Sequence, residues 1–103
     1  MTGMAITDQE RAEKSAKAMW ATDDASKWFG MSLDAVGPGT ATMSMTVQDC
    51  QTNGHDICHG GVIFALADSA FAFACNAYNK ITVAQSNSIT FVAPGRTGDR
   101  MVA

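Results

Sequence analysis

Apolar and polar side chains alternate with different periods along the chain, and the first thirty residues carry a helical pattern. Thr7, with a glutamate three residues later, forms the sequence of a capping box and predicts a helix over residues 8–20. The run from Thr22 to Asp24 can cap a second, short helix over residues 25–29, which Gly30 would end. This N-terminal segment is therefore expected to be helical.

The following residues change to the shorter period of β-strands. Residues 31–36 predict a first strand, a turn follows at Gly37-Pro38-Gly39, and residues 40–47 predict a second strand with one apolar face. Residues 81–93 predict a third strand, because apolar and amide side chains share one face: Ile81, Val83, Gln85, Asn87, Ile89 and Phe91. A further strand is expected to begin at Arg100.

Residues 60–78 predict a central helix that is apolar on every side. Such a helix is expected to be buried all round, with a sheet wrapped about it. Asp68 is the one acid within it. A buried carboxylate needs a counter-charge, hydrogen bonds or a cleft, and its pKa is expected to be raised, as in many general bases. The alternative interpretation is an aspartate that caps a neighbouring loop or pairs with an arginine.

The central helix begins on Gly60 and Gly61, whose N–H groups no side chain covers. Together with the partial positive charge of a helix N-terminus, they can hold a carbonyl oxygen that becomes an oxyanion. They can equally form an ordinary tight turn. Eight residues of helix place Gly60 and Asp68 about 12 Å apart, so one carbon cannot touch both. Two antiparallel helices across a two-fold axis could bring them together, which predicts a dimer.

The composition limits the partners and the compartment. Hydrophobic residues make up 47% and charged residues 17%, which favours some apolar surface buried against another subunit. The net charge is −3 and the basic residues are scattered, so no nucleic acid is expected. Three cysteines without a CxxC motif indicate a reducing compartment. Without a signal-peptide pattern, and with an apolar stretch too short for a bilayer, a cytoplasmic protein without a membrane is expected.

Several of these motifs together resemble the hotdog-fold acyl-CoA thioesterases, in particular the branch of phenylacetic-acid degradation. The likeness covers about residues 25–103 and rests on Asn53-Gly54, His59-Gly60-Gly61, Phe64 to Ala70, Ala74 to Asn76, Ile89 to Phe91, Pro94-Gly95 and Gly98-Asp99. The resemblance implies an α+β hotdog domain, an antiparallel sheet around a long central helix. It also implies hydrolysis of acyl-CoA thioesters to acid and CoA, with a homodimer or homotetramer that forms its sites between subunits.

Each role that the resemblance implies falls on a matching position. Asp68 corresponds to the general base or nucleophile, and the N–H of Gly60 to the group that polarises the thioester carbonyl. Asn53 corresponds to the residue that holds the water or the thioester. His59 fixes the loop that presents Gly60, with Gly61 beside the substrate. A polar residue of the next strand often assists, and the candidates for it are Gln85, Ser86 and Asn87. Coenzyme A belongs to the substrate, so no cofactor and no metal are implied.

The chain departs from this family at its end. Hotdog domains continue with further long strands, whereas this sequence stops at Ala103. We therefore expect one domain, truncated, with helices in residues 1–30 and the sheet and central helix in residues 31–103. Such a domain is expected to be poorly soluble unless other chains cover its helix, because wet apolar side chains and open sheet edges are unfavourable.

Other interpretations use the same residues. One is a zinc site with four ligands, Cys50, His55, Cys58 and His59, although their spacing fits no compact zinc motif. Cys58 beside a histidine could be a nucleophile. A non-catalytic acyl-CoA binder, or an inactive domain, is the main rival to an enzyme. Three phenylalanines could line a pocket for an aryl-acetyl or hydroxylated phenylacetyl group, and they could equally well be core residues: Phe64, Phe71 and Phe73. Arg96 and Arg100 could meet the phosphates of coenzyme A or only water.

Overall fold

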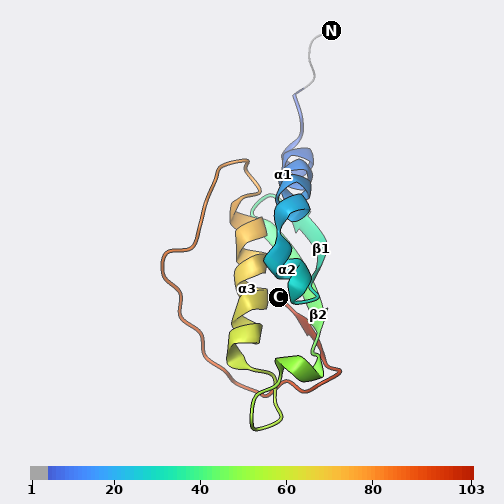
Figure 1. The fold of residues 1–103 in the computed structure, drawn as a ribbon. Coiled ribbons are helices and arrows are strands. Elements are labelled where there is room, and N and C mark those ends of the chain that lie inside the picture. The colour runs from blue at the N-terminus through green and yellow to red at the C-terminus, as the bar shows by residue number, and fades with distance from the viewer. Residues whose placement is uncertain (1–4) are drawn as a thin grey trace.

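A three-stranded antiparallel sheet and one long helix form the centre of the molecule. The structure, a computed structural model, describes residues 5–103. Its elements, in chain order, are α1 (Asp8–Thr22), α2 (Asp24–Trp28), β1 (Ser32–Gly37), β2 (Thr40–Thr46), the 3-10 turn η1 (Asp49–Gln51), α3 (Gly60–Cys75) and β3 (Arg100–Val102). The strand order is β1-β2-β3, and α3 lies along one face of this sheet (Figure 1).

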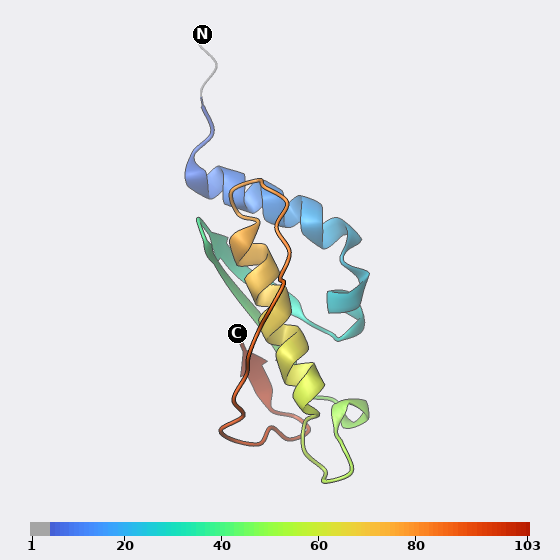
Figure 2. The same cartoon turned by 90° about the vertical axis from the view of Figure 1, so that its left-hand side faces the viewer.

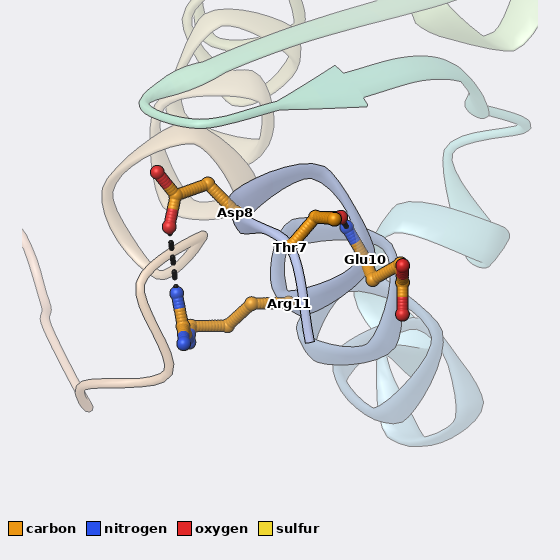
Figure 3. A network of polar contacts seen from close by, with 4 residues as sticks. All are labelled: Thr7, Asp8, Glu10 and Arg11. Atoms are coloured by element: carbon orange, nitrogen blue, oxygen red, sulfur yellow. Dashed lines mark hydrogen bonds and ion pairs between the residues drawn. The ribbon is translucent and has the colours of Figure 1, made fainter. Parts of the chain in front are cut away.

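The start of α1 has the predicted cap. The Thr7 hydroxyl accepts a hydrogen bond from the Glu10 N–H at 3.0 Å, and Arg11 pairs with Asp8 at 2.8 Å one turn along (Figure 3). The reciprocal bond of a capping box, from the Thr7 N–H to the Glu10 side chain, is absent among the described residues. The predicted helix is confirmed, and it runs to Thr22, two residues beyond Trp20.

Helix α2 is fastened to α3 through a chain of hydroxyl groups. The Asp23 carboxylate accepts hydrogen bonds from the N–H of Ser26 at 2.9 Å and from its hydroxyl at 2.7 Å. The Ser26 hydroxyl lies 2.8 Å from that of Ser69 on α3. Because Ser26 is only 2% exposed, these bonds replace its lost contact with water and set the position of α2 on α3.

The core lies between α3 and the sheet. Strand β2 contributes Met43 and Met45, and Val47 follows them, as the alternation predicted. Helix α3 contributes residues spaced along one face: Val62, Leu66, Ala70 and Phe73. The Trp20 ring of α1 closes the end of this core, 6.2 Å from the Phe73 ring between centroids. The two predicted strands of the hairpin are thereby confirmed within one residue at each end.

The central helix is buried on one face only, so the prediction that it is buried all round is wrong for the single chain. Its outer face leaves Asp68 exposed and Phe71 44% exposed, because the sheet covers only the opposite face. The helix ends at Cys75, before the predicted 78. Within residues 5–103, no helix has both the length and the apolar character that crossing a bilayer requires.

The predicted third strand, residues 81–93, does not form. These residues run extended along the side of α3 that faces away from the sheet (Figures 1 and 2). A strand requires a neighbouring strand for its backbone bonds, and none of the described strands lies beside this segment. Its start is held instead by a side chain, since the Asn76 amide makes two bonds with the backbone of Thr82, at 2.8 and 2.9 Å.

Candidate active site

The loop that leads into α3 is held by backbone hydrogen bonds at three places. The His59 N–H donates to the Gln51 carbonyl at 2.8 Å, and the Cys58 N–H donates to the Gly95 carbonyl at 2.7 Å. Within the loop, the Asn53 N–H donates to the Ile57 carbonyl at 2.8 Å. The residues just before Gly60 are therefore fixed both to η1, which precedes them, and to Gly95 much later in the chain.

Gln51 joins this loop to α2. Its side chain is 8% exposed; its amide N–H donates to the Phe29 carbonyl at 2.9 Å, and its amide oxygen accepts from the Gln48 N–H at 2.9 Å. Each buried polar atom of the amide thus has a partner. Gln51 therefore makes hydrogen bonds with three places: the Phe29 carbonyl after α2, the Gln48 N–H before η1 and, through its own carbonyl, the His59 N–H.

His59 is the N-cap of α3. Its Nδ1 accepts a hydrogen bond from the Gly61 N–H at 2.8 Å, so Nδ1 carries no proton in this arrangement. The N–H of Gly61 is therefore occupied, and the expectation that both glycine N–H groups are available is wrong for Gly61. The Gly60 N–H, in contrast, has no hydrogen-bond partner within residues 5–103.

Gly60 and Asn53 line the same cavity, of about 480 Å³, at the start of α3. The rest of its wall is mainly apolar and comes from the loop, from α3 and from the segment before Gly95: Ile57, Cys58, Ile63, Phe91, Val92, Ala93 and Pro94. The Asn53 side-chain oxygen accepts from the His55 N–H at 2.9 Å. An unpartnered N–H at a helix N-terminus, beside an apolar wall, is suited to a carbonyl oxygen that gains negative charge.

Asp68 lies elsewhere, two turns along α3. It is exposed, so the prediction of a buried acid is wrong for the single chain, because no described strand covers the outer face of α3 and the segment 81–93 leaves Asp68 open to solvent. A small hollow of about 160 Å³ contains it, together with Phe64, Phe71 and Asn87. Of the three candidates on the following segment, only Asn87 lies in this hollow. Gln85 and Ser86 are exposed and line none of the cavities that the described residues form around Gly60 or Asp68.

The alternative sites gain no support. Among residues 5–103, no three His, Cys, Asp or Glu side chains gather closely enough to hold a metal ion. Cys58 is 3% exposed, and this burial raises the pKa of its thiol, which is the opposite of what a nucleophilic thiolate needs. Arg100 pairs with Asp34 at 3.6 Å, with both side chains partly exposed.

Three contributions to the site were not predicted from the sequence. Gln51 stands in a polar stretch without periodicity, and its role depends on the distant Phe29. Gly95 was singled out only as part of the family resemblance, yet its carbonyl accepts a hydrogen bond from the Cys58 N–H. Phe91 was assigned to a strand face, whereas it lines the cavity of Gly60. No signal in the sequence marks these contacts, since each joins residues that lie more than twenty positions apart.

Comparison with known proteins identifies the family of this chain. Residues 55–103 match the sequence model of the family described as Thioesterase superfamily. The chain is 41% identical over 93 residues to the acyl-coenzyme A thioesterase PaaI of Escherichia coli strain K12. The aligned region covers 90% of this chain and 66% of that protein.

Solved structures give the same result. The E. coli PaaI protein from the phenylacetic acid degradation operon superposes with a TM-score of 0.91 at 38% identity, covering 93% of this chain and 70% of that one. The TT0310 protein from Thermus thermophilus gives a TM-score of 0.72 at 34% identity, covering 75% and 65%. This chain thus spans about two thirds of the length of these relatives. It has the hotdog fold, and it belongs to the thioesterase superfamily.

Proposed function

We propose that this protein hydrolyses acyl-CoA thioesters to a free acid and coenzyme A. The observation that carries the proposal is the unpartnered N–H of Gly60, which opens α3 inside a largely apolar cavity shared with Asn53. Such a donor stabilises the oxyanion that forms when a thioester carbonyl is attacked. The E. coli relative, an acyl-coenzyme A thioesterase, supports the same reaction.

The proposed roles follow from the chemistry of each group. The Gly60 N–H donates to the thioester carbonyl oxygen, and the amide of Asn53 holds the water or the thioester beside it. The Asp68 carboxylate either takes a proton from the attacking water or attacks the carbonyl carbon itself. The carbon–sulfur bond then breaks, and coenzyme A leaves as its thiolate. Where water attacks, the free acid forms in this step and the proton held by Asp68 passes to the thiolate. Where Asp68 attacks, the product is a mixed anhydride with Asp68, and a water molecule then hydrolyses it to the free acid and the regenerated carboxylate. No metal is assigned a role in this scheme.

A symmetric dimer would complete the site. Gly60 and Asp68 line separate cavities, and about 12 Å of helix separates them, so one thioester carbon cannot reach both in one chain. The segment 81–93 covers the outer face of α3 only in part, and near Asp68 this face leaves Phe71 44% exposed. A second copy packed antiparallel on this face would cover it and bring its Asp68 toward Gly60. A dimer of such dimers is the larger assembly that we propose.

An aryl-acetyl thioester, with or without a ring hydroxyl, is the substrate that we propose for this site. The apolar wall of the cavity supports an apolar acyl group. The origin of the E. coli structure, a protein of the phenylacetic acid degradation operon, supports an aryl-acetyl group in particular.

The test is the release of coenzyme A from phenylacetyl-CoA by purified protein and its Asp68→Asn variant. Loss of the base or nucleophile should lower kcat by a factor on the order of a hundred or more. The fold should not change, because Asp68 is exposed and asparagine is nearly isosteric. Asp24→Asn on α2, also an exposed aspartate, is the matched control and should keep full activity. Full turnover in folded Asp68→Asn protein would exclude the proposed role, and binding of acyl-CoA without turnover in the unmodified protein would favour the non-catalytic binder.

A further inference from the structure

The Phe91 ring lies directly over the α-carbon of Gly60. A Cβ atom built on Gly60 would come within 2.8 Å of Phe91 Cζ, 3.2 Å of Cε1 and 3.4 Å of Cε2. Real Cβ atoms do not approach other carbons as closely as 2.8 Å, so the present position of the ring requires glycine at residue 60. The contact therefore links the residue that carries the free N–H to a side chain 31 positions later in the chain.

The ring also forms part of the cavity wall. Phe91 lines the cavity of Gly60 together with Ile57 and Ile63, which face it from the loop and from α3. A carbonyl oxygen bound at the Gly60 N–H would place its acyl group against this wall, since the polar groups of the cavity are few. The space beside the Phe91 ring then limits the size of the acyl group.

Phe91 belongs to the wall of the site rather than to the core. It is 55% exposed, and it lies on the extended segment that passes along the outer side of α3 (Figure 2). The segment is next held by the Gly95 carbonyl, four residues later. Removal of the ring should consequently change the cavity more than it changes the stability of the fold.

We propose that Phe91 is a specificity-determining residue, whose ring on Gly60 closes the apolar end of the cavity and selects acyl groups by size. This assignment rests on the proposed function in one respect, namely that the thioester carbonyl is bound at the Gly60 N–H. Replacement of the ring by a methyl group should open space for longer acyl chains. A change of a few methylene groups in an apolar pocket alters selectivity by about 10-fold or more.

The first experiment measures kcat/KM for straight-chain acyl-CoA substrates from butyryl to decanoyl. In Phe91→Ala the ratio of decanoyl to butyryl activity should rise about 10-fold or more over the unmodified protein, and Phe91→Leu should give an intermediate ratio. Val83→Ala is the control, because Val83 lies on the same segment, is 82% exposed and does not line the cavity. An unchanged ratio in Phe91→Ala would overturn the assignment.

A second experiment tests the contact itself. Gly60→Ala keeps the backbone N–H but places a methyl group where the ring lies, so it should displace the ring and lower kcat/KM. The double variant Gly60→Ala with Phe91→Ala has room for that methyl group and should recover activity relative to Gly60→Ala alone. If the double variant is no more active than the product of the two single effects predicts, the contact does not shape the site.

A third measurement separates this assignment from the proposed function. Non-hydrolysable thioether analogues of the same chain lengths are titrated calorimetrically into the unmodified protein and Phe91→Ala. Suppose that the protein binds the analogues and that Phe91→Ala shifts the binding preference toward long chains, but that the unmodified protein hydrolyses none of the acyl-CoA substrates. The proposed function then fails, and the role of Phe91 stands. If the preference does not shift, or if no analogue binds, the role of Phe91 is overturned.

Discussion

The two halves of the candidate site lie on the same helix, but the chain supports them very differently. At the start of α3, the N-cap His59 and the loop before it are held by hydrogen bonds to Gln51, Gly95 and Gly61. Two turns later, Asp68 stands on an exposed face, and the segment beside it has no strand to pair with among residues 5–103. The proposed donor, the Gly60 N–H, is held in place within one chain, whereas the proposed acid, Asp68, is not.

This difference is consistent with the proposed dimer, in which each subunit would supply a different half of the site. Preorganised N–H groups stabilise an oxyanion because they need no rearrangement during the reaction. A carboxylate acts as a base best in an environment that excludes water, and the exposed Asp68 lacks that environment in the single chain. Cover from a second copy would supply it. The predictions that follow test this contrast, from the largest expected effect to the smallest.

The largest effect is expected from mixing two inactive variants. Asn53→Ala removes a group from the preorganised half, and Asp68→Asn removes the acid from the exposed half. If each site takes its halves from different chains, half of the randomly mixed dimers are heterodimers, and each of these has one intact site of two. Activity should then rise from near zero to about one quarter of the unmodified value. Release of coenzyme A after the chains are unfolded together and refolded measures it.

A matched control excludes recovery by other means. A chain that carries both substitutions is mixed with the Asp68→Asn chain, and every site in this mixture lacks its acid. No recovery is expected there. Recovery in the control, or none in the first mixture although the chains form mixed dimers, would contradict a site shared between subunits.

The same contrast separates what the sequence predicted from what it did not. Helix α1, the β1–β2 hairpin and the start of α3 were predicted, because local caps and periodicities determine them: the Thr7 cap, for example, lies three residues from its partner. The expected strand over residues 81–93 failed, because a strand exists only beside a neighbour. The expected burial of Asp68 failed in the same way, because the apolar pattern of α3 predicts a covered outer face, and no described strand of this chain covers that face.

The next effect concerns the buried amide of Gln51. In Gln51→Leu, the leucine side chain has a size similar to that of glutamine but no amide. The Phe29 carbonyl and the Gln48 N–H therefore lose their hydrogen-bond partners. Loss of such buried bonds should lower the free energy of unfolding by about 1–3 kcal/mol. It should also lower kcat, since the loop that presents Gly60 loses its link to α2. Chemical denaturation measures the first effect, and Gln85→Leu is the control for stability, because Gln85 is exposed and its amide makes no hydrogen bond within residues 5–103. Unchanged stability in Gln51→Leu would show that this loop is fixed elsewhere.

A smaller effect is expected at the N-cap. His59→Ala removes the acceptor of the Gly61 N–H and should cost about 1 kcal/mol of stability, as for other N-cap losses. The variant should also lose activity, because the freed Gly61 N–H competes with Gly60 for the carbonyl oxygen. His55→Ala is the matched control, since its side chain makes no hydrogen bond within residues 5–103. Equal stability and activity in both variants would contradict the capping role.

The smallest effect is a change of stability with pH, and it distinguishes Cys58, in the loop before α3, from Cys50, in η1. Burial raises the pKa of the Cys58 thiol, whereas Cys50 is exposed. Below the ordinary thiol pKa of about 8.5, Cys58 is neutral in both the folded and the unfolded chain, and it contributes nothing to the pH dependence of stability. Above it, the unfolded chain loses this proton first, which stabilises the unfolded state, so the free energy of unfolding should fall as the pH rises.

Thermal unfolding between about pH 7 and pH 10 tests this sign. The Tm of the unmodified protein should decrease more steeply above about pH 8.5 than the Tm of Cys58→Ala, which has no thiol to ionise. Cys50→Ala keeps the buried thiol and should follow the unmodified protein. If Cys58→Ala showed the same alkaline decrease as the other two proteins, the burial of Cys58 would not persist in solution. The loop before α3 would then be as loosely held as the outer face around Asp68, and the contrast between the two halves of the site would fail.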